Sequence, residues 1–406
     1  MVKHNNFFSN VYIMGGLRTP IGVYKGQYKR IRPELLGAAL LNELQRRGYG
    51  ADEIICGNAV GTGGNIGRLM ALYSNYDRAI PSYTVDMQCA SGAMAIIQGV
   101  RAIQSGMASQ IIAGGIESSS LQPLRVYADL DARRGNDLSH PKESVSAEYL
   151  VAQFSPDTVS PFAMLEGAHR TAIKHNMTKS DLDAWVLYSH SKALEGRNDE
   201  FLQQLIMGSD ELKAELTNLG ENDLLGYISH WGTADFKDES IKPRLTQNVL
   251  NRMRPILKDT DLLNGANTCY THDGAAFLGL TKEPQEFRIV DVLTWAGDPQ
   301  YSPEGAWHST EAILKRNELT MDSIDAVEWN EAFAVIDVLF ERAYKEHLHK
   351  YNQLGGALAY GHAYGASGAV NVLHLMAALQ RTKGRYGVTS IAGAGGTGTA
   401  ILIERV

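Results

Sequence analysis

Short apolar runs alternate along the chain with longer segments in which apolar residues recur every three or four positions. The runs have the length of strands, and the longer segments have the spacing of one face of a helix. Strands are predicted at 11–14, 54–58, 111–115, 288–293 and 325–329, and helices at 34–47, 90–105, 303–316 and from about 330 onwards. This alternation predicts a layered α/β protein.

The predicted helix at 90–105 lacks a polar face. Its residues are apolar or small on nearly every side as far as Gln98. Such a pattern is typical of a helix that is buried all round. We therefore expect the rest of the fold to enclose it.

The α/β pattern breaks between about residues 121 and 249. This part is more charged and richer in Asp, Ser, Asn and His, as at 132–144 and 230–244, and we expect both stretches to be surface loops. A helical insert is predicted at 180–195. From about residue 267 the alternation resumes, so the chain has two similar α/β halves separated by an excursion, which hints at duplication.

Composition narrows the class of protein. A chain of 406 residues with 44% hydrophobic content can bury a sizeable core, and 40 glycines against 12 prolines indicate tight backbone approaches rather than linkers. Lys and Arg number 38 against 45 Asp and Glu, with no long run of one sign. The net charge of −7 excludes the electrostatic surface of a nucleic-acid-binding protein and favours small-molecule partners.

Cysteine usage and hydropathy indicate a soluble, cytoplasmic protein. The chain has three cysteines, Cys56, Cys89 and Cys269, which are too few for a disulfide framework and favour a reducing compartment. They also lack the C-x-x-C spacing of a zinc site, so we expect no bound metal. Polar residues interrupt the apolar positions near the N-terminus, so no signal-peptide core is recognised. No apolar run approaches the roughly 18 to 20 residues of a membrane span.

Cys89 is the first candidate for chemistry. It follows the strand-like stretch 83–87 and directly precedes the small-residue helix, so its sulfur would lie at a helix N-terminus. Backbone N–H groups there favour a thiolate and can lower the pKa of a thiol from about 8.5 to between about 3.5 and 7.5. The alternative is a buried, inert cysteine. The small residues that follow favour the nucleophile interpretation, because a wall without long side chains lets an acyl chain approach the sulfur. They are Gly92, Ala93 and Ala95.

Two further segments contain polar residues that are candidates for the site. His362 lies in the glycine- and alanine-rich segment 355–369, which leaves its ring approachable as a general base or an oxyanion donor. The alternative is a structural histidine. Asn330 and Glu331 follow the predicted strand 325–329; they belong to a site or only cap the next helix.

The glycines at 393–398 match the G-x-G-x-x-G pattern of dinucleotide-binding proteins. A dinucleotide site needs a helix directly after the glycines, whereas the residues that follow here are strand-like. The Rossmann interpretation is therefore excluded, and we expect these glycines to form a turn that lines a site.

Together these blocks resemble the thiolase family, and the resemblance runs nearly end to end. Seven or more blocks in the right order are far more specific than any single one. The matching blocks are Arg18-Thr19-Pro20-Ile21-Gly22, Gly57-Asn58, the residues around Cys89, 113–118, Asp273-Gly274-Ala275-Ala276, Asn330-Glu331-Ala332-Phe333, 355–369 and 400–405.

The resemblance implies a five-layered αβαβα fold of two similar halves. The N-terminal half would comprise residues 1–120, completed by about 249–282; a loop domain would span 121–248, and the C-terminal half 283–406. It also implies a homodimer or homotetramer. Acyl-coenzyme A thioesters and coenzyme A would be the substrates, with no permanently bound cofactor and no metal.

The resemblance also implies roles for individual residues. Cys89 would carry the acyl group as a thioester, His362 would activate its thiol, and Asn330 would hold a water in the first oxyanion hole. The backbone N–H groups of Cys89 and Ala394 would form the second hole. Met164 and Ala363 would line the channel for the pantetheine arm.

One position departs from the family pattern. Thiolases have a second cysteine near the C-terminus that moves the α-carbon proton, and the corresponding position here is Ala392. An alanine cannot carry a proton, and the hydroxyl of nearby Ser390 is too weak a base to replace a thiolate unaided. This departure puts carbon–carbon chemistry in question but not the acylation of Cys89.

Cys269 stands where the family usually has a serine beside bound coenzyme A. One interpretation is a conservative exchange in a pocket wall, since cysteine behaves as a small hydrophobic residue. The other is that Cys269 supplies the missing proton relay. The family's glycine-histidine-proline motif also becomes Gly361-His362-Ala363, which loses a fixed φ but keeps the imidazole.

Two classes of function follow. The first is a thiolase-family acyltransferase that forms an acyl-Cys89 intermediate, with acetyl-CoA and acetoacetyl-CoA as default substrates and slow carbon–carbon chemistry. The second is a degenerate paralogue that binds acyl-CoA or a partner protein without turnover. A third interpretation, a condensing enzyme with another base such as Glu331, has only the acid itself in its favour.

Overall fold

The structure is a computed structural model of the chain. It describes residues 10–61, 64–126, 148–150, 153–156, 160, 162–220, 235–258 and 260–406. In this part of the chain, no helix is long and apolar enough to cross a membrane.

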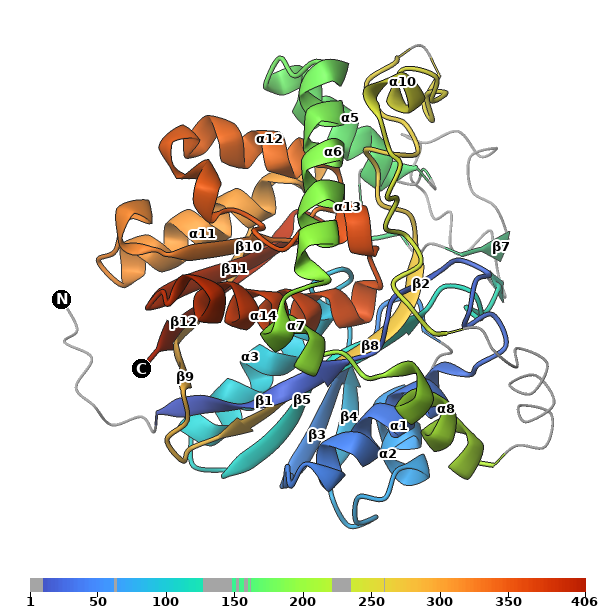
Figure 1. The fold of residues 1–406 in the computed structure, drawn as a ribbon, viewed down its shortest axis with the longest axis vertical. Helices are drawn as coiled ribbons and strands as arrows, with labels where there is room; N and C mark the ends of the chain where they lie inside the picture. The colour runs from blue at the N-terminus through green and yellow to red at the C-terminus, as the bar shows by residue number, and fades with distance from the viewer. Residues whose placement is uncertain are drawn as a thin grey trace.

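Ten strands form one mixed sheet in two halves that meet where β1 pairs with β9 (Figure 1). The first half runs in the order β1 (Val11–Arg18), β8 (His272–Thr281), β5 (Gln110–Ser118), β3 (Glu53–Gly57) and β4 (Ser82–Val85), with β2 (Gly22–Val23) beside β8. The second half runs β9 (Phe287–Ala296), β12 (Thr397–Arg405), β11 (Tyr386–Gly393) and β10 (Ala326–Trp329). Two short strands, β6 (Arg125–Val126) and β7 (Glu148–Tyr149), pair separately.

Helices cover both faces of each half, which gives the five layers predicted. α3 (Ser91–Gln104) and α14 (Tyr364–Thr382) pack on each other between the two halves of the sheet. α1 (Pro33–Arg46) and α2 (Ile66–Tyr73) cover the first half on its outer side, and α11 (Glu304–Arg316) covers the second. α12 (Ala334–Ala343) packs on α11.

The central helices approach each other backbone to backbone. A Cβ on Gly368 of α14 would lie 2.2 Å from the backbone nitrogen of Ala93 in α3, and a Cβ on Gly92 would lie 2.5 Å from the carbonyl oxygen of Gly365. Every residue of α14 from 365 to 379 is buried, and most of α3 is buried too. This contact brings the segment before α3, with Cys89, next to the segment before α14, with His362.

The predicted elements are present, with ends that differ by a few residues. β1 continues past the predicted end at residue 14, because its glycines keep pairing with β8 as far as Arg18 opposite Ala276. The helix expected from about residue 330 begins only at Ala334, after an extended Phe333.

The excursion contributes helices α5 (Ala163–Lys174), α6 (Lys179–Gly196), α7 (Glu200–Gln204), α8 (Ser209–Asn218) and α10 (Gln247–Leu250). The helix predicted at 180–195 is confirmed as α6, which begins with a capping box between Thr178 and Asp181. Met164 lies on α5. The stretch 132–144 is outside the described residues.

The prediction that 230–244 is a surface loop is confirmed for its described part, 235–244, which forms no helix or strand and exposes Lys237, Lys242 and Arg244. Two acids of this loop nevertheless have buried partners. Asp238 forms two hydrogen bonds of 2.8 and 3.0 Å with the guanidinium of Arg18, whose side chain has no exposed surface. Glu239 accepts the backbone N–H groups of Val23 and Gln27. Asp238 and Glu239 are thus partners for donors near β1 and β2, while the lysines of this loop and Arg244 are exposed.

Candidate active site

Cys89 lies in a tight turn between β4 and α3. The hydroxyl of Ser91 donates to the carbonyl oxygen of Gln88 at 2.6 Å and accepts the N–H of Met87 at 2.8 Å. Asp86 accepts the N–H of Gln88 at 2.8 Å, and Gln88 has a left-handed φ of +52°. Short side-chain hydrogen bonds therefore hold the backbone on both sides of the cysteine.

The thiol of Cys89 is buried, with 9% of the residue exposed. Burial raises its pKa to about 12, and the charges of Glu117 and Asp86 act in the same direction. The prediction of a lowered pKa is wrong, since α3 begins at Ser91 and the desolvation of a thiolate outweighs the favourable backbone N–H. Cys89 is therefore a thiol at neutral pH and needs a base to act as a nucleophile.

His362 is buried in the segment between α13 (Ala357–Tyr360) and α14. Its Nδ1 lies 2.7 Å from the hydroxyl of Ser367, which donates its own hydrogen to the carbonyl oxygen of Ala363 at 3.0 Å. The hydroxyl must therefore accept from Nδ1–H, which leaves the lone pair on Nε2. Burial lowers the pKa of His362 to about 3, so the ring is neutral and Nε2 carries no proton.

Asn330 contacts the same imidazole from the end of β10. Its Nδ2 lies 3.4 Å from Nε2 of His362, and its backbone N–H donates to the carbonyl oxygen of Ser390 at 3.0 Å. The buried Oδ1 of Asn330 has no hydrogen-bond partner among the described residues. A buried acceptor without a partner is costly, so this oxygen is suited to a donor that arrives from outside the protein, such as a water.

Glu331 does not reach the site. Its buried carboxylate accepts from the hydroxyl of Ser189 at 2.6 Å, from Nδ2 of Asn352 at 2.8 Å and from the N–H of Leu358 at 3.0 Å. Three donors hold it under the segment before α13, which makes it a structural anchor. The interpretations of Glu331 as a helix cap or as a catalytic base gain no support from these contacts.

The glycine-rich turn between β11 and β12 lies beside the turn of Cys89, as predicted for a site-lining turn. A Cβ on Gly393 would lie 3.3 Å from the carbonyl oxygen of Met87 and 3.6 Å from Cβ of Ala90. Ala394 follows directly and is buried. Gly395 and Gly396 have φ values of +81° and +74°, which only glycine adopts freely.

Ala392 is buried in β11 and pairs with Gly398 of β12. The nearby hydroxyl of Ser390 lies 2.7 Å from the hydroxyl of Thr310 on α11, so it is hydrogen-bonded inside the second half of the fold. Neither residue offers a titratable group to Cys89.

Glu117, near the end of β5, connects the segment after β3 to the start of α14. Its buried carboxylate accepts from the side chain of Asn58 and the backbone N–H of Ala59, each at 2.9 Å, and from the N–H of Gly365 at the start of α14 at 3.1 Å. Burial raises its pKa to about 7 against these donors. In the sequence, Glu117 was noted only as part of the block 113–118, because no local pattern indicates that a carboxylate will be buried.

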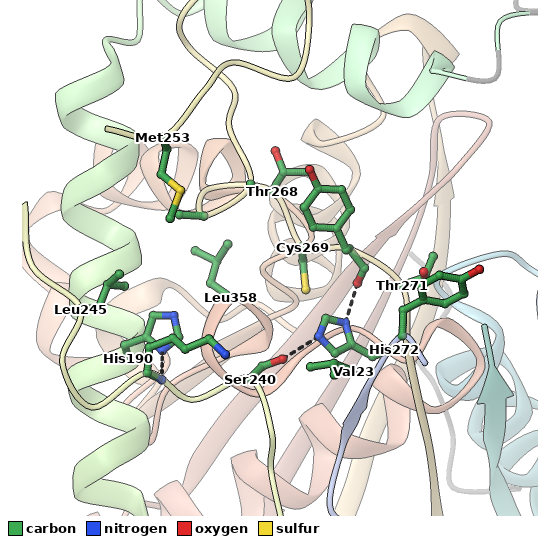
Figure 2. A pocket seen from close by; sticks show the side chains of 15 residues that line it. Val23, His190, Ser240, Leu245, Met253, Thr268, Cys269, Thr271, His272 and Leu358 are labelled. Carbon is green, nitrogen blue, oxygen red and sulfur yellow. Dashed lines mark hydrogen bonds between the residues drawn. The ribbon is translucent and has the colours of Figure 1, made fainter. Parts of the chain in front are cut away.

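Cys269 lines a pocket of about 290 Å³ (Figure 2). Its sulfur points into the pocket between Leu358 and His272, and its S–H donates to the carbonyl oxygen of Ala357 at 3.1 Å. Burial raises the pKa of this thiol well above its ordinary value, and the charge of Glu331 adds to the effect. Its backbone N–H donates to the carbonyl oxygen of Ala332, next to the Asn330 segment.

The same pocket contains a lysine that sequence reasoning missed. The ammonium of Lys242 donates at 3.4 Å to the backbone carbonyl oxygen of Glu239 and has no carboxylate partner among the described residues. Its charge acts on His190 and His272, and burial lowers the pKa of each imidazole to about 4. One cation beside two neutral rings makes this pocket suited to an anionic group. In the sequence, Lys242 lay in a charged stretch that resembled a surface loop.

The structure brings together most but not all of the predicted site residues. Ala363 is buried beside His362 at the start of α14, and Cys89 lies in the same packed cluster. Met164 packs against the cluster of the second half, and neither Met164 nor Ala363 lines the pocket of Cys269. Among the described residues, no group of three His, Cys, Asp or Glu side chains is placed to hold a metal ion.

Two family descriptions cover nearly all of the chain. "Thiolase, N-terminal domain" matches residues 11–284 and "Thiolase, C-terminal domain" matches residues 284–405. The chain belongs to the thiolase family. The predictions of the family and of an acyltransferase enzyme are thereby confirmed.

Curated relatives of this thiolase-family chain are similar over their whole length. "Putative acetyl-CoA C-acetyltransferase VraB" of Staphylococcus epidermidis is 32% identical over 411 residues, with 97% of this chain and 98% of that protein covered. YhfS of Bacillus subtilis, described in the same words, is 30% identical over 406 residues, with 97% and 99% covered.

Solved structures share the fold. The Bacillus anthracis acetyl-CoA acetyltransferase aligns with a TM-score of 0.84 at 25% identity, over 99% of this chain and 100% of that one. Human mitochondrial 3-ketoacyl-CoA thiolase in complex with CoA aligns with a TM-score of 0.82 at 24% identity, over 100% of both chains. These likenesses confirm the predicted thiolase fold.

Proposed function

We propose that this enzyme transfers an acetyl or acyl group between coenzyme A and an acyl-CoA through a thioester on Cys89, with acetyl-CoA and acetoacetyl-CoA as default substrates. The observation that carries the proposal is the neutral His362, whose free Nε2 lone pair is fixed by Ser367 in the segment packed against the turn of Cys89. A buried thiol with a raised pKa needs such a base.

The first step is acylation. Nε2 of His362 takes the proton of Cys89, and the sulfur attacks the carbonyl carbon of the acyl-CoA. Asn330 holds a water with its unpartnered Oδ1, and this water and His362 stabilise the developing oxyanion. In the reverse step, the backbone N–H groups of Cys89 and Ala394 stabilise the oxyanion on the acyl-cysteine. Each aligned N–H contributes about 3 kcal/mol at the transition state.

The coenzyme A moiety occupies the pocket of Cys269. Lys242 supplies the positive charge for one of its phosphates, and Cys269, Met164 and Ala363 border the path of the pantetheine arm. No bound metal or permanent cofactor is part of the proposal. Cys269 is also a candidate for the compensating thiol, since it is the one cysteine besides Cys89 near this path.

The proposal places the enzyme in the cytoplasm as a homodimer or homotetramer. All three cysteines are free, which suits a reducing compartment. Residues 1–120 with about 249–282, the loop domain 121–248 and residues 283–406 are the proposed structural units.

A coenzyme A-dependent cleavage assay with acetoacetyl-CoA tests the carbon–carbon step. Cleavage that is lost in Cys89→Ser supports the proposal. The competing function, a degenerate paralogue that binds acyl-CoA or a partner protein, is favoured by Ala392 alone. That function requires binding of acyl-CoA or of a partner protein, with no acetyl-Cys89 and no cleavage of acetoacetyl-CoA.

A further inference from the structure

Cleavage of a 3-ketoacyl thioester leaves an electron pair on the α-carbon of the departing acyl-CoA, and a protein group must protonate that carbon. Ala392 has no proton to give, and the hydroxyl of Ser390 is hydrogen-bonded to Thr310. A donor must therefore come from another side chain beside Cys89.

Tyr364 is such a side chain. It is the first residue of α14 and follows His362 by two positions. Its ring centroid lies 4.7 Å from that of the His362 imidazole, with the planes at 73°, and the side chain packs against the cluster that contains Cys89 and Ala363. The ring therefore contacts the proposed base and packs against the cluster to which the nucleophile belongs.

The hydroxyl of Tyr364 is available for chemistry. Among the described residues it has no hydrogen-bond partner, and the side chain is only partly buried. The buried tyrosines differ, as Tyr28 donates to the carbonyl oxygen of Pro20 and Tyr360 to that of Leu354. The oxygen of Tyr364 is not among the buried atoms without a partner, so the hydroxyl is accessible and can bond to a ligand.

The electrostatic surroundings of this hydroxyl keep it protonated. Burial raises the pKa of Tyr364 well above its ordinary value, and the charges that Cys89 and Cys269 would carry as thiolates raise it further. The phenol is therefore protonated at rest and suited to donate. Cys269 is the competing donor, but its S–H already points to the carbonyl oxygen of Ala357.

We propose that the hydroxyl of Tyr364 donates and accepts the α-carbon proton of the acyl-CoA substrate, in the role that Ala392 cannot fill. This inference rests on the proposed function, because it needs an acyl-Cys89 intermediate.

The steps balance. Cys89 gives its proton to His362, and its sulfur attacks the keto carbon of acetoacetyl-CoA. The carbon–carbon bond breaks, which leaves acetyl-Cys89 and the acetyl-CoA carbanion, and Tyr364 protonates that carbanion and becomes a phenolate. Incoming coenzyme A gives its S–H proton to the phenolate, its sulfur attacks acetyl-Cys89, and the released Cys89 thiolate takes the proton back from His362.

Tyr364→Phe removes only the hydroxyl and tests the proposal. The enzyme is incubated with acetyl-CoA in D₂O, and the exchange of acetyl protons is followed by NMR, because exchange reports α-carbon proton transfer without bond cleavage. Acetylation of Cys89 is measured in parallel by mass spectrometry. We expect exchange and acetoacetyl-CoA cleavage to fall about 100-fold or more, the usual contribution of a general acid–base group, and to fall far more than acetylation does.

Two further variants sharpen the result. Tyr76→Phe removes a hydroxyl that is hydrogen-bonded to the carbonyl oxygen of Tyr49, outside the site, and it should keep wild-type exchange. Cys269→Ser tests the competing thiol and should lose less exchange than Tyr364→Phe. The proposal is overturned if Tyr364→Phe still acetylates Cys89 and exchanges acetyl protons at a near-normal rate. It is also overturned if Cys269→Ser still acetylates Cys89 but loses more exchange than Tyr364→Phe does. A wild-type enzyme that never acetylates Cys89 instead refutes the proposed function.

Discussion

Ser367 fixes the tautomer of His362. The Ser367 hydroxyl lies 2.7 Å from Nδ1 of the imidazole and has already given its hydrogen to the carbonyl oxygen of Ala363. The lone pair on the opposite ring nitrogen therefore faces Asn330 and the reaction. A side chain one turn into α14 thus decides which nitrogen of the base is free.

Removal of this hydroxyl should disturb the tautomer without moving the helix. We expect Ser367→Ala to lower the rate of Cys89 acetylation about tenfold, since a fixed tautomer is part of general-base catalysis. Ser367→Thr keeps the hydroxyl and should recover most of the rate. Stopped-time mass spectrometry with acetyl-CoA measures both. Equal rates in wild type and Ser367→Ala would show that Nδ1 needs no partner.

The buried thiol of Cys89 predicts a distinctive pH dependence. Burial raises its pKa to about 12, so the thiolate fraction grows as pH rises and does not level off near neutrality. Alkylation of Cys89 by iodoacetamide in the free enzyme should therefore accelerate about tenfold per pH unit from about pH 7 to 10. Peptide mapping against Cys89→Ser isolates this site. A plateau below about pH 8 contradicts the raised pKa.

The contact between α3 and α14 sets the distance between the two halves of the site. Gly368→Ala would place a Cβ 2.2 Å from the backbone of Ala93, so the helices must separate. We expect a loss of about 1–3 kcal/mol in the free energy of unfolding and a large loss of activity. Urea unfolding monitored by circular dichroism measures the first quantity.

Gly167→Ala is the matched control, because this helical glycine has only the carbonyl oxygen of Gln300 at 3.4 Å from the new Cβ. Alanine is the better helix former, so the variant should be unchanged or up to about 1 kcal/mol more stable. Equal destabilisation of both variants would mean that helix–helix distance is not what Gly368 controls.

Lys242 should act on binding rather than on chemistry. Its ammonium has no carboxylate partner among the described residues and lines the pocket of Cys269. We expect Lys242→Met to raise the KM for coenzyme A about tenfold, as loss of one charge-assisted contact does, with a smaller effect on kcat. Lys192→Met, which removes a lysine paired with Glu195 on the surface of α6, is the control. A fall in kcat at unchanged KM argues against the assignment.

Local pattern was sufficient to predict the parts of the fold that local chemistry determines. The small-residue run after Cys89 predicted a helix buried on all sides, which is α3. The same kind of run at 355–369 predicted an approachable His362, whereas the structure buries this residue. The α6 helix was likewise predictable, because the capping box that begins it lies in the same stretch of chain.

Long-range partners could not be predicted from the sequence. Asp238 resembles a solvated charge until the fold places it against Arg18, some 220 positions earlier in the chain. The pKa of Cys89 is another example, since the helix N-terminus is visible in the sequence but the degree of burial is not. Lys242, Ser367 and Tyr364 acquire roles only through side chains from distant segments.

Mass spectrometry of the intact protein and its peptides after incubation with acetyl-CoA tests the central claim most directly. We expect an added acetyl group on Cys89, absent in Cys89→Ser and removed when free coenzyme A is supplied. Full acylation at Cys89 that coenzyme A reverses supports acyl transfer through this thiol. An unmodified Cys89 across the pH range in which the protein stays folded contradicts the account.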